Sequence, residues 1–445
     1  MRSLWQRGHF GRAQISLLPE DSPYVRRSIE TCRTIGGVVR RHDLLLVAYA
    51  LCFAAMVLTN DLAAPRALYF IAVLPAALFV ALPFTGRLLA GSAVFWSIVA
   101  YLVAMGLASL VSHGIPANEL NRHFRLIPLV LTFIAVVAFL ASDARSLRRI
   151  LLFSCVIISL SALYNMVVYL AYDGKMCPPV ISPERLCAVL GMPDYFNSTN
   201  LSAPYALYAV AAVAVLVHGG LSRIDRVLFS SSAAILAAAL ILTGSRGGYV
   251  AAALGCGVLA VCGPRWSRLA IATAGVLAVA AVAVDTHLRD LLLARGLSYR
   301  PELWSAYLAM AFERPLTGVG ILGNINMPMH DGYVVDQPHN LVLSGFVRGG
   351  IVGALAMAAT IAASIYYALR YWLATRNAIP LALIVTMFGY GMLDYQLLAT
   401  YPTWPWITFW FPIGVCAGIE TALKDAAQLD PAAVSSQADR SRATG

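Results

Sequence analysis

About twelve apolar stretches, most of them close to the roughly 20 residues that a helix needs to cross a lipid bilayer, run through this chain of 445 residues. Hydrophobic residues make up 60% of the sequence and charged residues 12%, a composition that excludes an ordinary soluble globular protein. We therefore expect an all-α, polytopic integral membrane protein. The predicted spans cover residues 44–59, 66–84, 88–111, 126–142, 150–171, 201–217, 227–243, 248–263, 269–284, 340–369, 379–398 and 404–423.

The basic residues set the predicted orientation of these spans. On a soluble domain a net charge of +10 would suggest nucleic-acid binding, but here about two thirds of the 32 basic residues fall in the tails and in alternate short connections. The positive-inside rule makes these segments cytoplasmic, so both termini are expected inside. The predicted organisation is a tail over 1–43, transmembrane helices one to nine over 44–284, an outer loop over 285–339, helices ten to twelve over 340–423 and a tail over 424–445.

Two outer connections, over 172–200 and 285–339, are long enough to hold a site. In the second, the pattern over 301–312 predicts a short helix that cannot span the bilayer and lies in its outer interface. In the first, Cys177 and Cys187 could form a disulfide if the outer compartment is oxidising. The sequence leaves the redox state of these two cysteines open.

Three short polar stretches stand beside the outer ends of predicted helices. They surround Arg246 before the eighth span, Arg300 at the start of the interfacial helix and His339 at the start of the tenth span. Helix starts favour negative charge, and a guanidinium fork matches phosphate oxygens, so two such arginines on one face indicate a diphosphate site. Arginines at span ends also often only anchor to lipid headgroups. Gly247 and Gly248 favour binding, because they let a ligand approach the backbone closely.

The order and spacing of these stretches resemble the bacterial O-antigen ligase and O-antigen polymerase superfamily of membrane glycosyltransferases. The match in motifs covers about residues 190–355, and the match in the layout of spans and outer loop covers most of the chain. A further, weaker match is the asparagine-containing stretch 197–200. The resembling residues are Ser245, Arg246, Gly247, Arg300, Trp304, 315–320 (PLTGVG), 338–340 (PHN), Leu343 and 349–353 (GGIVG).

The resemblance implies glycan transfer from an undecaprenyl diphosphate carrier at the periplasmic face of the bacterial inner membrane, in the ligase branch to the lipid A core oligosaccharide. It implies that His339 deprotonates the acceptor hydroxyl while Arg246 and Arg300 hold the diphosphate, with inversion and without a metal or other cofactor. The start of the tenth span also disfavours the imidazolium form of the histidine. The expected partners are the two glycolipids and membrane lipids, and no nucleic acid.

Other charged residues have open roles at this stage. Arg122, Arg125 and Arg185 stand in outer connections, where they could bind acceptor phosphates or only anchor the helices. Arg348 lies in the tenth span, where many members of the family carry an acidic residue. Because an arginine within a span needs a partner, we expect a structural ion pair with Asp394 in the eleventh span.

A cation site is the less favoured interpretation of the second outer loop. His330, Asp331, Asp336 and His339 could gather a metal, but four donors on one loop are common by chance. We therefore expect no metal.

Two other functions compete with the ligase. A polymerase would join two carrier-linked glycans and would use the same diphosphate site. A transporter or flippase for a lipid-linked sugar would need charges midway through several spans, and only Arg348 and Asp394 clearly qualify.

Overall fold

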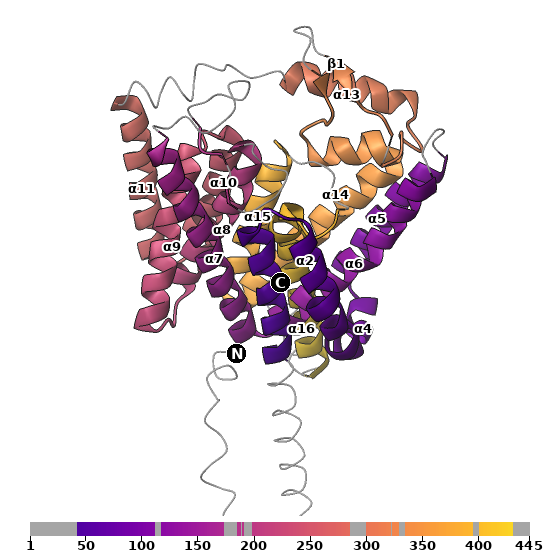
Figure 1. Ribbon diagram of the computed structural model, residues 1–445. Helices are drawn as coiled ribbons and strands as arrows, with labels where there is room; N and C mark the ends of the chain where they lie inside the picture. Colours follow the sequence, from indigo (N-terminus) through magenta and orange to yellow (C-terminus); the bar gives the residue numbers. More distant parts are fainter. Residues whose placement is uncertain are drawn as a thin grey trace, which may run out of the picture.

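The computed structural model is a bundle of helices that run between two opposite faces of the molecule (Figure 1). It describes residues 42–111, 117–172, 185–187, 189–190, 198–284, 300–321, 323–328, 334–394 and 400–429. Most of the predicted tails over 1–43 and 424–445 lies outside these residues. The described elements, with η marking π-helical turns, are the helix His42–Leu58, α2 (Ala63–Leu68), η2 (Tyr69–Val73), α3 (Leu74–Ala76), η3 (Ala77–Ala81), α4 (Leu82–Ala90), α5 (Ala93–Val111), α6 (Ala117–Ala141), α7 (Ala144–Ala171), α8 (Ser198–His218), α9 (Arg223–Leu242), α10 (Arg246–Cys262), α11 (Arg265–Val284), α13 (Arg300–Glu313), β1 (Met327–Pro328), β2 (Val334–Val335), α14 (Leu341–Thr375), α15 (Ile379–Gly391), η4 (Trp406–Trp410) and α16 (Phe411–Leu429).

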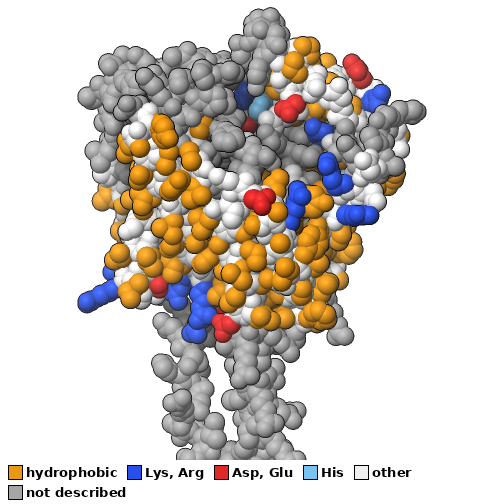
Figure 2. Space-filling view, viewed as in Figure 1, with side chains coloured by type: hydrophobic (Ala, Val, Ile, Leu, Met, Phe, Trp, Pro, Cys, Tyr) orange, Lys and Arg blue, Asp and Glu red, His pale blue; other side chains and the backbone are white. Residues whose placement is uncertain are grey.

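Each predicted apolar stretch overlaps a helix, although the helix in the eleventh, α15, ends at Gly391. In the described part of the chain, eight helices are long and apolar enough to cross a membrane, and three more are apolar but shorter. Figure 2 shows hydrophobic side chains over much of the surface, with charged side chains near its lower edge and on the upper right part of this face. A broad hydrophobic surface is what a bilayer-spanning bundle requires. The prediction of an all-α, polytopic membrane protein is confirmed.

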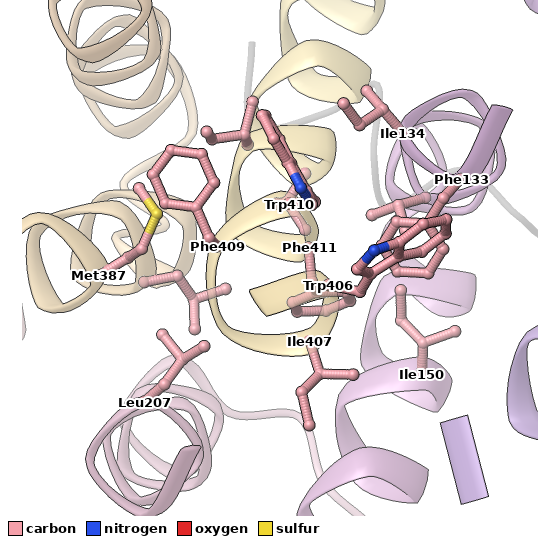
Figure 3. Packing of buried hydrophobic residues seen from close by; sticks show 14 of the residues in the cluster. Phe133, Ile134, Ile150, Leu207, Met387, Trp406, Ile407, Phe409, Trp410 and Phe411 are labelled. Atoms are coloured by element: carbon pink, nitrogen blue, oxygen red, sulfur yellow. The ribbon is translucent and has the colours of Figure 1, made fainter. Parts of the chain in front are cut away.

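The η4–α16 segment passes through the centre of the bundle and is largely buried. Figure 3 shows Phe133 from α6, Leu207 from α8 and Met387 from α15 around it. The rings of Trp406 and Phe133 lie 5.0 Å apart, and the Tyr208 hydroxyl donates to a backbone carbonyl of η4 over 2.9 Å. This packing fixes α8 and α15 relative to each other. The site described below lies where α8 meets the start of α10 and where the chain leaves α15.

A break in α14 departs from the predicted continuous tenth span. Gly350 has φ 61° and ψ −162°, which is not helical. The carbonyls of Val347 and Arg348, freed by the break, each accept a hydrogen bond of 2.9 Å from the 315–320 segment, and the Ile351 N–H donates to that segment over 2.7 Å. The loop segment thus satisfies backbone groups that lipid could not, and it is held against the outer part of α14.

Gly350→Ala should destabilise the protein, because a Cβ there would overlap the Leu316 carbonyl and the φ/ψ pair is accessible only to glycine. We expect a loss of about 1–3 kcal/mol from backbone strain alone, measured as a lower midpoint of thermal unfolding in detergent. Gly257→Ala is the control, because a Cβ at this α10 position would meet nothing within 4 Å. Equal unfolding midpoints for the two variants would contradict the structural role of the break.

A small outer unit rests on the bundle, formed by α13, the β1–β2 hairpin and the first turns of α14 (Figure 1). Its own core contains Leu303, Tyr307 and Val347. The Tyr307 hydroxyl lies 2.8 and 3.0 Å from the carbonyl oxygens of Ile325 and Val335. The short helix predicted over 301–312 is therefore confirmed as α13, and its packing fixes the position of its first residue, Arg300.

Candidate active site

A histidine, a carboxylate and an arginine from three separate segments meet beside the outer end of α15. The Nδ1 atom of His339 lies 2.6 Å from Oδ1 of Asp394, and Nη2 of Arg300 lies 4.0 Å from Oδ2 of the same carboxylate. Arg300 Nε also donates to the Leu393 carbonyl over 3.1 Å. Asp394 is only 3% exposed, whereas the other two side chains are partly exposed. The buried carboxylate therefore holds two more accessible groups in place.

The Pro-His-Asn sequence is held on both sides of the histidine. His339 has φ 50°, a left-handed conformation that a residue other than glycine adopts only under local constraint. Before it, the Pro338 carbonyl accepts from the Trp304 indole over 3.0 Å. After it, Asn340 caps α14 with a 3.0 Å bond from an N–H of the first turn and donates to the Met392 carbonyl over 3.2 Å. These contacts fix the backbone on both sides of His339 and explain the asparagine at position 340, whose side chain caps α14.

The contact with Asp394 also selects the tautomer of His339. With the carboxylate ionised, the ring proton lies on Nδ1 and donates to it, so that Nε2 keeps its lone pair. Such a ring can take a proton at Nε2, and the carboxylate then stabilises the imidazolium. The pair has the arrangement of a general base with its orienting group.

The expected ion pair between Arg348 and Asp394 is not formed. Arg348 Nη1 donates instead to the Ile321 carbonyl, which the inserted loop brings beside the broken part of α14. The prediction placed Asp394 within the eleventh span, but this residue lies beyond the end of α15 and contacts His339 and Arg300. A backbone carbonyl thus supplies the acceptor that we had expected from a carboxylate.

Arg246 is the first residue of α10, and the sequence around it allows a close helix contact. Ser245 is the N-cap, with its hydroxyl 3.4 Å from the Gly248 N–H, and this hydroxyl also accepts from Ser202 of α8 over 2.9 Å. A Cβ at Gly248 would lie 2.7 Å from the Ser202 Cβ. Glycine is therefore required where α8 meets the start of α10.

The same helix start lies against the segment that carries the carboxylate. A Cβ at Gly247 would be in ordinary contact with the Leu393 Cβ, at 3.7 Å. Leu393 is adjacent to Asp394 and accepts the hydrogen bond from Arg300. The structure thus brings the three predicted polar stretches, around Arg246, Arg300 and His339, to one end of the bundle.

The three arginines considered for acceptor binding differ in their surroundings. Arg185 is buried, and its Nη2 donates to the Gly244 carbonyl over 2.9 Å, which supports the turn before α10. This contact favours a supporting role for Arg185. Arg122 and Arg125 are exposed near the start of α6 and remain candidates for acceptor binding.

Parts of the outer loops lie outside the described residues, among them Cys177, His330 and Asp331. Cys187 is disulfide-bonded. Cys177, the possible partner considered in the sequence analysis, lies outside the described residues. Within the described residues, no group of three or more histidine, cysteine, aspartate or glutamate side chains is placed to hold a metal.

The fold and the site together define a class: a polytopic membrane protein with a histidine–carboxylate pair and arginines at one end of its helices. A family model described as O-antigen ligase matches residues 231–358, which include Arg246, Arg300 and His339. The O-antigen ligase of Pseudomonas aeruginosa is 30% identical over 190 residues, covering 41% of this chain and 45% of that relative. The match thus spans less than half the length of this relative. Both matches support membership in the O-antigen ligase family and confirm the resemblance inferred from the sequence.

Proposed function

We propose that this chain is an O-antigen ligase that transfers a glycan from undecaprenyl diphosphate to the lipid A core oligosaccharide. The observation that carries the proposal is the 2.6 Å contact between His339 and Asp394, with Arg300 4.0 Å from the same carboxylate. The family match covers Arg300 and His339 and ends before Asp394, and it supports the same reaction class. With the basic connections inside, the site faces the periplasm, the termini face the cytoplasm, and the protein lies in the bacterial inner membrane.

The proposed reaction is a one-step displacement at the anomeric carbon of the donor sugar. The acceptor hydroxyl oxygen forms the new glycosidic bond while the bond from that carbon to the diphosphate oxygen breaks. The hydroxyl proton moves to Nε2 of His339, and the electron pair of the broken bond leaves with the diphosphate. Asp394 stabilises the resulting imidazolium. A single displacement inverts the anomeric centre.

The arginines replace a metal in this mechanism. Negative charge grows on the diphosphate as it departs, and Arg246 and Arg300 supply fixed positive charge for it. A guanidinium has five N–H donors, and the Leu393 carbonyl engages only the Nε donor of Arg300. Donors therefore remain for phosphate oxygens.

The proposal is tested by reconstituting the purified protein in liposomes with the lipid-linked glycan and the lipid A core, in excess chelator. We expect the glycan to be joined to the lipid A core under these conditions. Longer glycans on the carrier, with no product on the core, would show a polymerase instead. Activity that returns only with added magnesium or manganese would overturn the role given to the arginines.

Replacing Arg246 or Arg300 with alanine in the same assay should lower transfer by about 10- to 100-fold, because a hydrogen bond to a charged group contributes about 1.5–3 kcal/mol. Lysine should restore only part of the rate, since it lacks the planar fork. Arg314→Ala is the matched control, an exposed arginine directly after α13. An alanine variant that transfers as fast as this control would remove its arginine from the site.

A further inference from the structure

A cavity lined by two arginines lies at the end of the bundle opposite the candidate active site. α10 begins at that site with Arg246 and ends at Cys262, about 25 Å away at 1.5 Å per residue. Beside Cys262 opens a cavity of about 460 Å³, between the ends of α8, α10 and α14 and the start of α11. The proposed transfer reaction makes no use of it.

The cavity carries positive charge without a matching carboxylate. Arg268 from α11 and Arg376 after α14 both line it, and none of the described residues that line it is acidic. Neither arginine takes part in an ion pair within the described part of the chain. Two exposed guanidinium groups at one cavity form an attractive site for an anion with several oxygens, such as a phosphate.

Hydrogen bonds to the backbone fix the cavity walls. The Trp372 indole donates to the Cys262 carbonyl over 3.1 Å, and the Arg376 guanidinium lies 5.5 Å from the centre of this indole ring. His218 Nε2 accepts from the Ala378 N–H over 3.2 Å, so a neutral ring carries its proton on Nδ1 and has a donor left. The site is therefore built before any ligand binds.

Exposed apolar side chains stand directly beside this charged site. Val261, which lines the cavity, and Leu269, which follows Arg268, are each 71% exposed. Trp266 at the start of α11 and Leu373 at the end of α14 are also exposed. A soluble anion gains nothing from such surfaces, whereas a phospholipid can place its headgroup in the cavity and its acyl chains along them.

We propose that this cavity binds the phosphate of an anionic phospholipid, such as phosphatidylglycerol, in the leaflet opposite the candidate active site. Arg268 and Arg376 hold the phosphate, and the acyl chains lie over Val261 and Leu269. The proposal does not depend on the transfer reaction. It requires only that the bundle spans a membrane.

The test measures binding of phosphatidylglycerol to the purified full chain in detergent by native mass spectrometry. The double variant Arg268→Gln with Arg376→Gln should bind phosphatidylglycerol about tenfold more weakly, as two charge-assisted contacts are lost. Phosphatidylcholine carries the same phosphate together with a quaternary ammonium that the two guanidinium groups repel, so its binding should be weaker and should change less than that of phosphatidylglycerol. The matched control is Arg265→Gln with Arg370→Gln, two exposed arginines on the same helices that do not line the cavity.

Three results would overturn the proposal: unchanged binding in the cavity variant, an equal loss in the control variant, or displacement of the lipid by an equal concentration of glycerol phosphate. The last result would assign the cavity to a soluble anion. A thermal unfolding midpoint measured without added lipid shows whether the double variant is folded. If the double variant is not folded, a phosphatidylglycerol with a photoreactive headgroup is cross-linked to the unaltered protein. We then expect labelling of a peptide that contains Arg268 or Arg376. Labelling of other peptides alone would contradict the assignment.

Discussion

Replacing His339 with alanine should lower the rate of glycan transfer by about 100-fold or more, the usual effect of removing a positioned proton acceptor. Donor binding should survive, because Arg246 and Arg300 are unchanged and Arg300 keeps its hydrogen bond to the Leu393 carbonyl. Two measurements separate these effects: the single-turnover rate in liposomes, and binding of the lipid-linked donor in the absence of acceptor. A base that acts only in the chemical step changes the first and not the second.

Asp336→Asn is the control for this experiment. Asp336 is exposed, stands three residues before His339 and is the neighbouring carboxylate that could replace it as base. We expect its asparagine variant to transfer at close to the original rate. If instead the Asp336 variant is inactive and the His339 variant is active, the base is the carboxylate, and His339 is only an interfacial polar residue.

The helices of this protein follow from the sequence because their signal is local. A span is predicted from a run of consecutive apolar residues alone, and each predicted span overlaps a helix. The positions where helices begin beside Arg246 and His339 are also predictable from the sequence, since Ser245 and Asn340 are residue types that cap helices. What the sequence did not indicate is the break in α14 at Gly350. Two adjacent glycines in a span are compatible with close packing of an intact helix as well as with a break. The break is stabilised by the loop that donates hydrogen bonds to the freed carbonyls, and this contact cannot be predicted from the glycines alone.

The partner of Asp394 was mispredicted for a related reason. We paired Asp394 with Arg348 because the two residues have similar depths in neighbouring predicted spans. However, α15 ends before Asp394, and α14 is broken near Arg348. The carboxylate therefore reaches His339, 55 residues earlier in the chain. Contacts between distant segments depend on where helices end, which hydropathy does not fix to within a turn. The grouping of Arg300 with His339 was predicted, whereas its central carboxylate was found only in the structure.

Asp394→Asn should reduce turnover by about 100- to 10,000-fold while the protein stays folded. Asparagine keeps the shape of the side chain but cannot stabilise the imidazolium, and its amide N–H₂ can donate to Nδ1 of His339, which places the ring proton on Nε2 and blocks the base. Because Asp394 acts through the histidine, the loss should appear in kcat and hardly in KM for the donor. Thermal unfolding in detergent shows whether the variant remains folded.

Arg348→Gln distinguishes this role from a structural ion pair. It removes the hydrogen bond to the Ile321 carbonyl, so we expect a lower unfolding temperature with turnover largely retained, the opposite of the result at Asp394. Equal stability losses and equal activity losses for the two variants would restore the ion pair and contradict the present assignment.

A double variant, His339→Ala with Asp394→Asn, provides the sharpest comparison. If the two residues act as one base, the double variant is no slower than His339→Ala alone, because an absent base cannot be misoriented. Losses that multiply would mean that Asp394 contributes independently of the histidine, through Arg300 and the diphosphate.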